Sequence, residues 1–406
     1  MHIVLLGARP EVVIELHDLG HTLTSLYTEI NKANTEKYAD RLAYSGFIPS
    51  YDVPELAWSV LLHLGVADEV DLVIPNHELA VVTAGFLNRL IGAESDRLDL
   101  PIAMAGRDKA YQKSLWTAHG VPTARYVTLT NTPRSLKELQ EDVGDLRAPF
   151  VVKPPALGGS RLVTACATLD DVFETLRDNG ELRHSVIEER QSGDEWHLDG
   201  SVVDGRVEHL MVSRYLAPLI ETKHGSTLRS VAYPPKHHAE LYGQALEFAQ
   251  SAVDGLGGRW GVFHLEVFGE PGSFTAGELA WRPAGVLAPE SAERTIGVNL
   301  WVAHARLLAG EELTVRAPEG DSVFGFVCLP VKPGAVNGVT REDLEELPGV
   351  RHIQMVVQPG RTMREMHAST VCVAMALIEG KDIADCERLI NEAVQLTRDL
   401  HDAKSV

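Results

Sequence analysis

The sequence lacks several features that mark particular classes of protein. Its 406 residues hold four cysteines, Cys166, Cys328, Cys372 and Cys386, whose wide spacing forms no CxxC or Cys/His metal motif, so we expect buried free thiols. Runs of about 18 apolar residues are also missing, as is a basic leader with a small-residue cleavage site. We therefore expect a cytoplasmic protein without a membrane segment.

Positive charge is scarce as well. Lysine and arginine number 37 against 57 aspartates and glutamates, which gives a net charge of −20. Such a surface repels a polyanion, so a general nucleic-acid-binding role is disfavoured, and an anionic nucleotide would need a local basic pocket. The 45% hydrophobic and 23% charged residues are typical of a globular protein, and the length predicts two or three domains.

The N-terminal part alternates apolar strands with helix-like stretches. Strands are predicted at 2–7, 22–27 and 70–75, and a helix at 78–91, which indicates an α/β domain with a doubly wound parallel sheet at 1–104. A nicotinamide-binding site is disfavoured, because the loop after the first strand has a lone Gly7 in place of GxGxxG.

The rest of the chain has an α+β pattern. Short strands at 149–153, 185–188 and 198–203 alternate with helix-like stretches at 169–177 and 238–256, and we assign 105–318 to a second domain. A third domain at 319–406 is expected to be a small sheet covered by one helix. Its strands are predicted at 323–329, 353–358 and 371–378, and its helix at 383–400.

Two lysines and a glycine-rich turn are candidates for phosphate binding. Lys153 ends an apolar strand and is followed closely by Gly158, Gly159 and Ser160, so a fixed cation lies beside a turn whose backbone amides can approach an anion. Lys109 lies upstream. Taken singly, each feature is ordinary, since most lysines are solvated and most such turns are simple hairpins.

An acidic segment follows, with Glu188, Glu189, Arg190 and Glu195. An apolar strand that runs into such a turn can present backbone groups to an adenine edge, and Glu195 can accept hydrogen bonds from ribose hydroxyls. An exposed acidic hairpin is the alternative.

Two predicted neighbouring strands, joined by a turn at 269–272, are the most informative segments. Alternation places His264 and Glu266 on one face of the first strand, and Glu278, Ala280 and Arg282 on one face of the second. Two carboxylates about 4 Å apart repel by roughly 4 kcal/mol at an effective dielectric of about 20, so a cation must offset them. Arg282 with magnesium, which prefers oxygen ligands, would do so. A plain Glu–Arg salt bridge across the hairpin is the alternative.

In this order and spacing, the segments resemble the ATP-grasp superfamily over nearly the whole chain. The flanking segments are similar to those of its biotin-carboxylase-like branch, and the run Glu-x-Ala-x-Arg-Pro-Ala-Gly is closer to bacterial L-amino acid ligases, which form dipeptides, than to biotin carboxylases. The residues that carry the resemblance are Asp108-Lys109, Val152-Lys153 with Gly158 to Ser160, Glu188-Glu189 with Glu195, His264-x-Glu266, and Glu278-x-Ala280-x-Arg282.

The resemblance implies an ATP-grasp fold and a set of site roles. Lys109 and Lys153 would contact the ATP phosphates, under a loop formed by Gly158, Gly159 and Ser160. The other implied roles are adenine binding by Glu188, Glu189 and the backbone near Arg190, ribose binding by Glu195, magnesium binding by Glu266 and Glu278, and stabilisation of the transferred oxygens by Arg282. One departure is Ala280, where the superfamily usually has an asparagine, so one oxygen ligand is missing.

The implied activity is that of a carboxylate–amine ligase, which activates a small carboxylate as an acyl phosphate with ATP and joins it to an amine. His264, His224 and Glu221 are candidate bases, and His224 lies in a segment, 216–227, that could cover the acceptor amine. The resemblance also places Val286, just after Arg-Pro-Ala-Gly, near the substrate pocket, with room for a side chain larger than alanine or glycine. Packing of this valine in the core is the alternative.

Other functions stay open at this stage. One alternative is an ATP-dependent carboxylase or purine-pathway enzyme, although its glycine-rich loop would be reduced here to Gly158 and Gly159. Another is a non-catalytic ATP-binding protein, which the loss of a ligand at Ala280 favours. Because members of the superfamily are often dimers, a homodimer is also left open.

Overall fold

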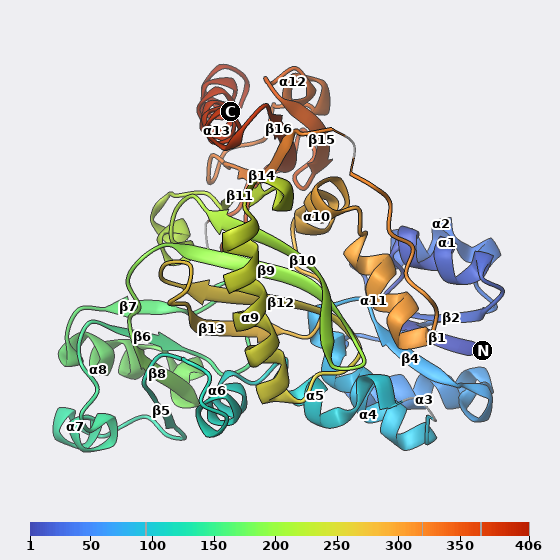
Figure 1. The fold of residues 1–406 in the computed structure, drawn as a ribbon, viewed down its shortest axis with the longest axis horizontal. Coiled ribbons are helices and arrows are strands. Elements are labelled where there is room, and N and C mark those ends of the chain that lie inside the picture. Colours follow the sequence, from blue (N-terminus) through green and yellow to red (C-terminus); the bar gives the residue numbers. More distant parts are fainter. Residues whose placement is uncertain (94–95, 319, 366–367, 406) are drawn as a thin grey trace.

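Three β-sheets organise the protein (Figure 1). The computed structural model describes residues 1–93, 96–318, 320–365 and 368–405, with their side chains except those of residues 96, 223 and 224. Within these ranges the chain has an N-terminal four-stranded sheet, a second four-stranded sheet, and a central eight-stranded sheet. No helix of the described part is both long and apolar enough to span a bilayer.

The N-terminal sheet is parallel, in the order β3-β2-β1-β4, as the alternation of strands and helices predicts. Every side chain of β1 is buried, which is typical of a parallel strand covered on both faces. In Figure 1, α1 and α2 lie on one side of this sheet and α3 and α4 on the other. The strands are β1 (His2–Leu6), β2 (Thr22–Tyr27), β3 (Tyr44–Phe47) and β4 (Leu72–Pro75), and the helices are α1 (Pro10–Asp18), α2 (Lys32–Lys37), α3 (Pro54–Leu64), α4 (Val81–Ile91) and α5 (Leu100–Ala105).

The second sheet is small and antiparallel, in the order β5-β8-β6-β7. Its inner side chains, among them Val152 and Ile187, form a separate apolar cluster with Leu139 of α7 and Leu176 of α8. Its elements are β5 (Tyr126–Leu129), α7 (Leu136–Val143), β6 (Phe150–Lys153), β7 (Thr164–Cys166), α8 (Leu169–Asp178) and β8 (Ser185–Glu189).

The central sheet runs in the order β13-β12-β9-β10-β11-β14-β16-β15, with antiparallel pairs throughout. Its strands are β9 (Glu195–Val203), β10 (Arg206–Tyr215), β11 (Arg229–Tyr233), β12 (Gly261–Phe268), β13 (Thr275–Ala280), β14 (Val323–Leu329), β15 (Val350–Met355) and β16 (Ala374–Gly380).

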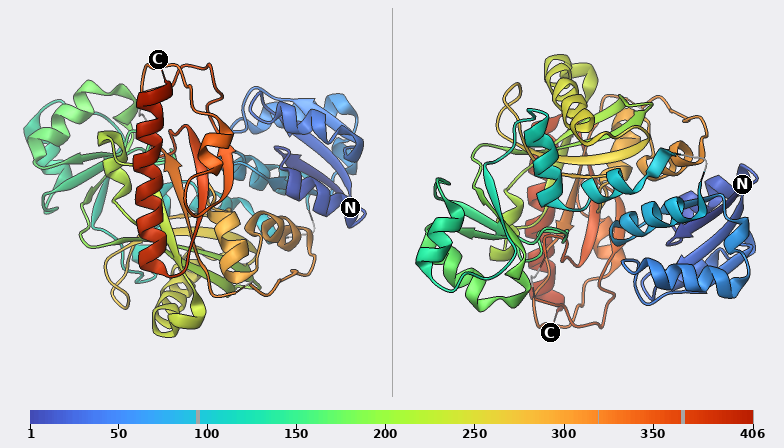
Figure 2. Two further views of the ribbon diagram at one scale, coloured as in Figure 1. Left: turned by 90° about the horizontal axis from the view of Figure 1, so that it is seen from above. Right: turned by 90° about the horizontal axis from the view of Figure 1, so that it is seen from below.

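The C-terminal strands differ from the expected separate sheet. β14 pairs with β11 through Ser230 and Phe326, so the C-terminal strands extend the central sheet across the predicted boundary at 318/319. The predicted helix is present as α13 (Ile383–Lys404) and covers β14 and β16 (Figure 2). The sequence predicted β14 with its observed bounds, and it placed the other two strands within about three residues of β15 and β16. It carries no information about which edge of a sheet these strands join. The domain boundaries stay predictions.

The remaining helices connect the sheets. Arg306 on α11 forms an ion pair with Glu15 on α1, and the guanidinium of Arg9 lies 3.6 Å from the ring centroid of Trp301, so the N-terminal domain is fixed against α11. These helices are α6 (Lys109–Ala118), α9 (Ala239–Leu256), α10 (Ala288–Ile296), α11 (Leu300–Ala309) and α12 (Arg341–Glu345), with short 3-10 turns that include η3 (Glu78–Ala80) and η6 (Leu219–His224).

Candidate active site

A cavity of about 930 Å³ brings most of the predicted residues together. Strands of both the small sheet and the central sheet line it, and the N-terminal domain contributes Glu78. The predicted residues that line the cavity are Lys109, Lys153, Gly158, Gly159, Ser160, Glu188, Arg190, Glu195, His264, Glu266, Glu278, Arg282 and Val286.

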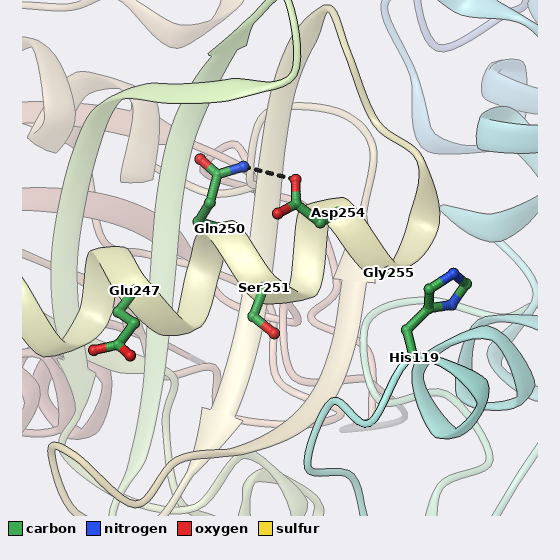
Figure 3. A pocket seen from close by; sticks show the side chains of 6 residues that line it. All are labelled: His119, Glu247, Gln250, Ser251, Asp254 and Gly255. Carbon is green, nitrogen blue, oxygen red and sulfur yellow. Dashed lines mark hydrogen bonds between the residues drawn. The ribbon is translucent and has the colours of Figure 1, made fainter.

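A second hollow, of about 380 Å³, lies on the outside of α9 beside His119 (Figure 3). Gln250 and Asp254, one helical turn apart, are hydrogen-bonded to each other at 2.8 Å. The residues that line this hollow include Glu247 and Asp254 but no lysine or arginine. It therefore offers an anionic nucleotide no cation, and the larger cavity is the better candidate for the active site.

Glu266 and Glu278 lie directly opposite each other on β12 and β13, as the alternation predicted. Their side chains are 24% and 27% exposed, so both carboxylates open into the cavity. Lys109 Nζ lies 2.9 Å from Glu278 Oε1, and His264 Nε2 lies 3.5 Å from Glu266 Oε1. Two facing carboxylates open to a cavity fit a magnesium ion, although Ala280 opposite His264 adds no oxygen ligand.

The position of Lys109 follows from how α6 begins. Asp108 caps the helix by accepting a hydrogen bond from the Tyr111 N–H, and Lys109 donates its own N–H to the Pro155 carbonyl at 2.9 Å. One turn later the Gln112 amide pairs with both the N–H and the C=O of Leu279 on β13. These contacts hold α6 against the edge of the sheet, so the Lys109 ammonium points at the carboxylate pair.

Lys153 is bound to Glu188 on the neighbouring strand. Lys153 Nζ donates to Glu188 Oε1 at 2.6 Å, and Lys113 Nζ lies 2.9 Å from Oε2. Burial would raise the pKa of Glu188, but Lys113 and Lys153 outweigh it and lower this pKa to about 2. The Glu188 carboxylate therefore fixes two cations in this structure, and its contact with adenine stays a prediction. Lys113 was not predicted, although its place four residues after Lys109 puts both lysines on one helix face.

Glu189 does not line the cavity, contrary to its predicted nucleotide-binding role. Its carboxylate accepts hydrogen bonds from Arg125 Nη1 at 3.2 Å and from the Arg147 N–H at 2.9 Å. The cause is the alternation of side chains along β8, which places Glu188 inward and its neighbour outward. Arg190, at the end of the strand, does line the cavity.

Glu195 is buried at the start of β9. Its Oε2 accepts a hydrogen bond from the Leu219 N–H at 2.9 Å, and burial together with the nearby Glu266 raises its pKa to about 8. Further hydrogen-bond donors would stabilise this buried carboxyl group. Ribose hydroxyls would supply them, and the ribose role stays a prediction.

His264 belongs to a buried chain of polar groups that the sequence did not reveal. Its Nδ1 lies 2.8 Å from Asp199 Oδ1, while the other oxygen of Asp199 pairs with His197 Nδ1, and His197 Nε2 lies 2.7 Å from Ser230 Oγ. Burial would lower the pKa of His264, but Asp199 and Glu266 raise it to about 10. An imidazolium at neutral pH cannot accept a proton, which favours an electrostatic role for His264 over the predicted role as a base.

Arg282 contacts Glu78 and not the carboxylate pair it was expected to offset. Its Nη2 donates to Glu78 Oε2 at 2.6 Å, and Arg107 binds the other oxygen of Glu78. Burial would raise the pKa of Glu78, but Arg282 and Arg107 lower it to about 2. The glycine-rich loop rests on the same carboxylate, because a Cβ on Gly158 would collide with its oxygens. Glu78 was missed, although it follows β4 at the carboxyl end of the parallel sheet, where ligands of such sheets bind.

Three predicted residues remain, namely Val286, Glu221 and His224. Val286 lines the cavity with a left-handed backbone (φ 60°), which is rare for a β-branched residue. Glu221 is not among the lining residues and lies 3.5 Å from Arg190. The side chain of His224 lies outside the described part of the structure, so its predicted substrate role stays a prediction.

Comparisons with known proteins agree with this geometry. Residues 114–286 match the family model of the ATP-grasp domain, and residues 327–398 match that of the L-amino acid ligase C-terminal domain 2. The L-arginine-specific L-amino acid ligase of Bacillus subtilis is 24% identical over 328 residues, which are 78% of this chain and 76% of the relative.

Solved structures share the fold at lower identity. The L-amino acid ligase of Bacillus licheniformis is 17% identical with a TM-score of 0.76, over 100% of this chain and 97% of that one. Carboxyaminoimidazole ribonucleotide synthase of Aspergillus clavatus, solved with ATP, is 16% identical with a TM-score of 0.73, over 98% of both chains. The predicted ATP-grasp fold is confirmed. The chain thus has an ATP-grasp fold, with one segment that matches the ATP-grasp domain and another that matches the L-amino acid ligase C-terminal domain 2.

Proposed function

We propose that the protein is an ATP-dependent carboxylate–amine ligase, which forms an amide or peptide bond through an acyl phosphate and releases ADP and phosphate. The observation that carries this proposal is one cavity that holds two lysines, two facing carboxylates and an arginine. An amino acid or another small acid supplies the carboxylate. The relatives named as L-amino acid ligases support the same reaction class.

The first step is transfer of the γ-phosphoryl group of ATP to the carboxylate. A carboxylate oxygen forms a bond to phosphorus while the bond to the β–γ bridging oxygen breaks, so ADP leaves and an acyl phosphate remains. Lys109 and Lys153 stabilise the phosphate charge, and the loop at Gly158 to Ser160 covers it. Arg282 lines the same cavity and would stabilise charge on the transferred oxygens.

The second step is attack by the amine. The amine nitrogen bonds to the acyl carbon, loses a proton, and expels phosphate as the C–O bond breaks. Arg282 stabilises the oxygens of the leaving phosphate. A cationic His264 keeps the negative charge of Glu266 balanced and leaves proton acceptance to another group or to solvent.

Magnesium fits the carboxylate pair. Glu266 and Glu278 would hold the ion, which neutralises phosphate oxygens when bound. Lys109 would then turn from Glu278 to the phosphates, since its Nζ also contacts the Leu157 carbonyl at the base of the glycine-rich loop.

A non-catalytic ATP-binding protein is the second candidate, and Ala280 is the feature that favours it. This buried alanine lines the cavity and offers no oxygen beside the carboxylate pair. Magnesium commonly keeps several waters, so the missing ligand does not by itself prevent catalysis.

An ADP-release assay over pools of L-amino acids, with mass spectrometry of the products, tests the proposal. A ligase gives ADP and a new amide in equal amounts, and only when a carboxylate and an amine are both present. ADP formed with bicarbonate in place of an amino acid would indicate a carboxylase. Saturable ATP binding without ADP under every condition would select the non-catalytic alternative and overturn the proposal.

A further inference from the structure

Two short motifs of the same kind face each other across the pair formed by β9 and β12. β9 carries His197-x-Asp199, and β12 carries His264-x-Glu266. The register sets Asp199 opposite His264 and His197 opposite Glu266, so the four side chains share one face of the sheet. The two histidines and Glu266 line the cavity, whereas Asp199 is not among the lining residues. Asp199 can therefore act on a bound ligand only through its neighbours.

Both carboxylate oxygens of Asp199 are bound to histidines. Oδ1 lies 2.8 Å from His264 Nδ1, and Oδ2 pairs with His197 Nδ1. The residue is 0% exposed. A buried carboxylate without partners is strongly unfavourable, so the two contacts stabilise Asp199 and at the same time restrict both imidazole rings.

The His197 ring is fixed by residues of the strands beyond β9. Its Nε2 lies 2.7 Å from Ser230 Oγ on β11. The ring also packs against two aromatic rings, with centroid distances of 4.7 Å to Tyr215 and 5.9 Å to Phe326. Rotation of His197 would break the hydrogen bonds at both of its nitrogens. His197 therefore gives Asp199 a fixed position.

The His264 ring transmits this order to the carboxylate pair. With Nδ1 held by Asp199, its Nε2 lies 3.5 Å from Glu266 Oε1. The residue opposite His264 on β13 is Ala280, which has no polar side-chain atom, so the orientation of the ring depends on Asp199. Carboxylates and histidines at metal sites are commonly oriented in this way by an outer hydrogen-bond partner.

We propose that Asp199 is a positioning residue of the active site, which holds His264 against Glu266 and thereby orients that carboxylate toward the metal. His197 and Ser230 hold Asp199 in turn. The inference rests on the proposed function, because it takes Glu266 as a magnesium ligand. Loss of an outer hydrogen-bond partner typically lowers metal affinity or activity by about 10- to 100-fold.

The test measures Mn²⁺ binding to the full chain in the presence of ADP, by electron paramagnetic resonance of the free ion. Asp199→Asn keeps the size of the side chain but offers one acceptor oxygen in place of two, so it cannot hold both rings. Its Kd for Mn²⁺ should rise about 10-fold or more, and kcat with Mg²⁺ should fall. Asp204→Asn, just after β9, is the matched control. Asp204 is exposed, and its left-handed φ of 48° is one that asparagine also adopts.

Two replacements of His264 separate positioning from packing. His264→Asn keeps an N–H toward Asp199 but does not extend to Glu266, whereas His264→Gln can extend to Glu266 but loses its contact with Asp199. Both should weaken Mn²⁺ binding as Asp199→Asn does. In the His264→Gln background, Asp199→Asn should add little, because the two residues act in series. Fully additive effects would overturn the positioning role.

Thermal melts without metal report whether each variant folds. An unchanged Kd for Mn²⁺ in a folded Asp199→Asn variant would overturn the inference. If that variant does not fold, His264→Gln decides, because wild-type Mn²⁺ affinity there would mean that contact with Glu266 suffices without Asp199. The outcome is separate from that of the proposed function. A wild type that binds Mn²⁺ and ADP but forms no ADP from any pair of amino acids would overturn the ligase function, while weakened Mn²⁺ binding by Asp199→Asn would still support the positioning role.

Discussion

Arg282 Nη2 donates a hydrogen bond to Glu78 Oε2 at 2.6 Å, although 204 residues separate them in the sequence. The bond joins the N-terminal domain to the segment that follows β13. Arg107 binds the same carboxylate and also the Ala156 carbonyl, just before the glycine-rich loop. The Glu78 carboxylate thus orients the Arg282 side chain and supports the glycine-rich loop.

Glu78→Gln should lower kcat much more than it raises the KM for ATP. The amide keeps the shape but loses the charge that orients Arg282, and loss of a stabilising group for the transferred oxygens typically costs about 100-fold or more. Steady-state kinetics with varied ATP separate the two parameters. Glu141→Gln, on the exposed face of α7 beside Lys137, is the matched control. Equal changes in kcat and in ATP affinity would instead indicate a general structural role for Glu78.

Glu278→Gln should abolish ADP formation and leave the fold intact. The variant loses a charged oxygen from the pair that faces the cavity, and the repulsion between phosphate and Glu266 is no longer offset by a shared ion. Its circular dichroism and melting temperature should match the wild type. Glu270→Gln, in the exposed turn of the same hairpin, should keep full activity. Near-normal turnover of the Glu278 variant would argue against magnesium at this pair.

Lys153→Met should weaken ATP binding by about 1.5–3 kcal/mol, the usual worth of a hydrogen bond to a charged group. Calorimetry with ATP measures this directly. The fold should survive, because Glu188 keeps Lys113 as a partner 2.9 Å away. Lys137→Met, at an exposed position on α7, controls for the loss of a positive charge. An unchanged affinity would make Lys153 a structural residue of the sheet.

The parts of the site that the sequence predicted are local in origin. Alternation along a strand placed Glu266 opposite Glu278, and the short link from Lys153 to Gly158 placed a cation beside the loop. The prediction that the Glu189 side chain lies in the cavity was wrong, because successive side chains of a strand point to opposite faces. Strand 22–27 was predicted with the bounds that β2 has in the structure.

The parts that were missed depend on contacts between distant segments. No local sequence pattern indicates that Glu78 contacts Arg282, or that Asp199 lies between two histidines. The order of strands in the central sheet was missed for the same reason. The apolar pattern of β14 does not specify a partner strand, and the structure shows that it pairs with β11. These contacts between distant segments form only when the three sheets pack together.

Glu290→Gln should stabilise the protein at high pH and not at low pH. Burial raises the pKa of Glu290 to about 7 from an ordinary 4.5, and its buried Oε2 has no hydrogen-bond partner among the described residues. Between these two pH values the folded protein holds a proton that the unfolded chain releases, so the stability of the wild type falls as pH rises from 4.5 to 7. The loss above pH 7 corresponds to at most about 3 kcal/mol.

Glutamine cannot ionise and avoids this loss, so the melting temperature of Glu290→Gln should exceed that of the wild type at pH 8 and approach it near pH 4.5. Thermal melts at both pH values measure the difference. Glu240→Gln, in the exposed first turn of α9, occupies a comparable helical position and should show no such pH-dependent gain. Equal melting temperatures for Glu290→Gln and the wild type at pH 8 would mean that Glu290 is ionised at no cost, which would require a cation or water to reach Oε2 in solution.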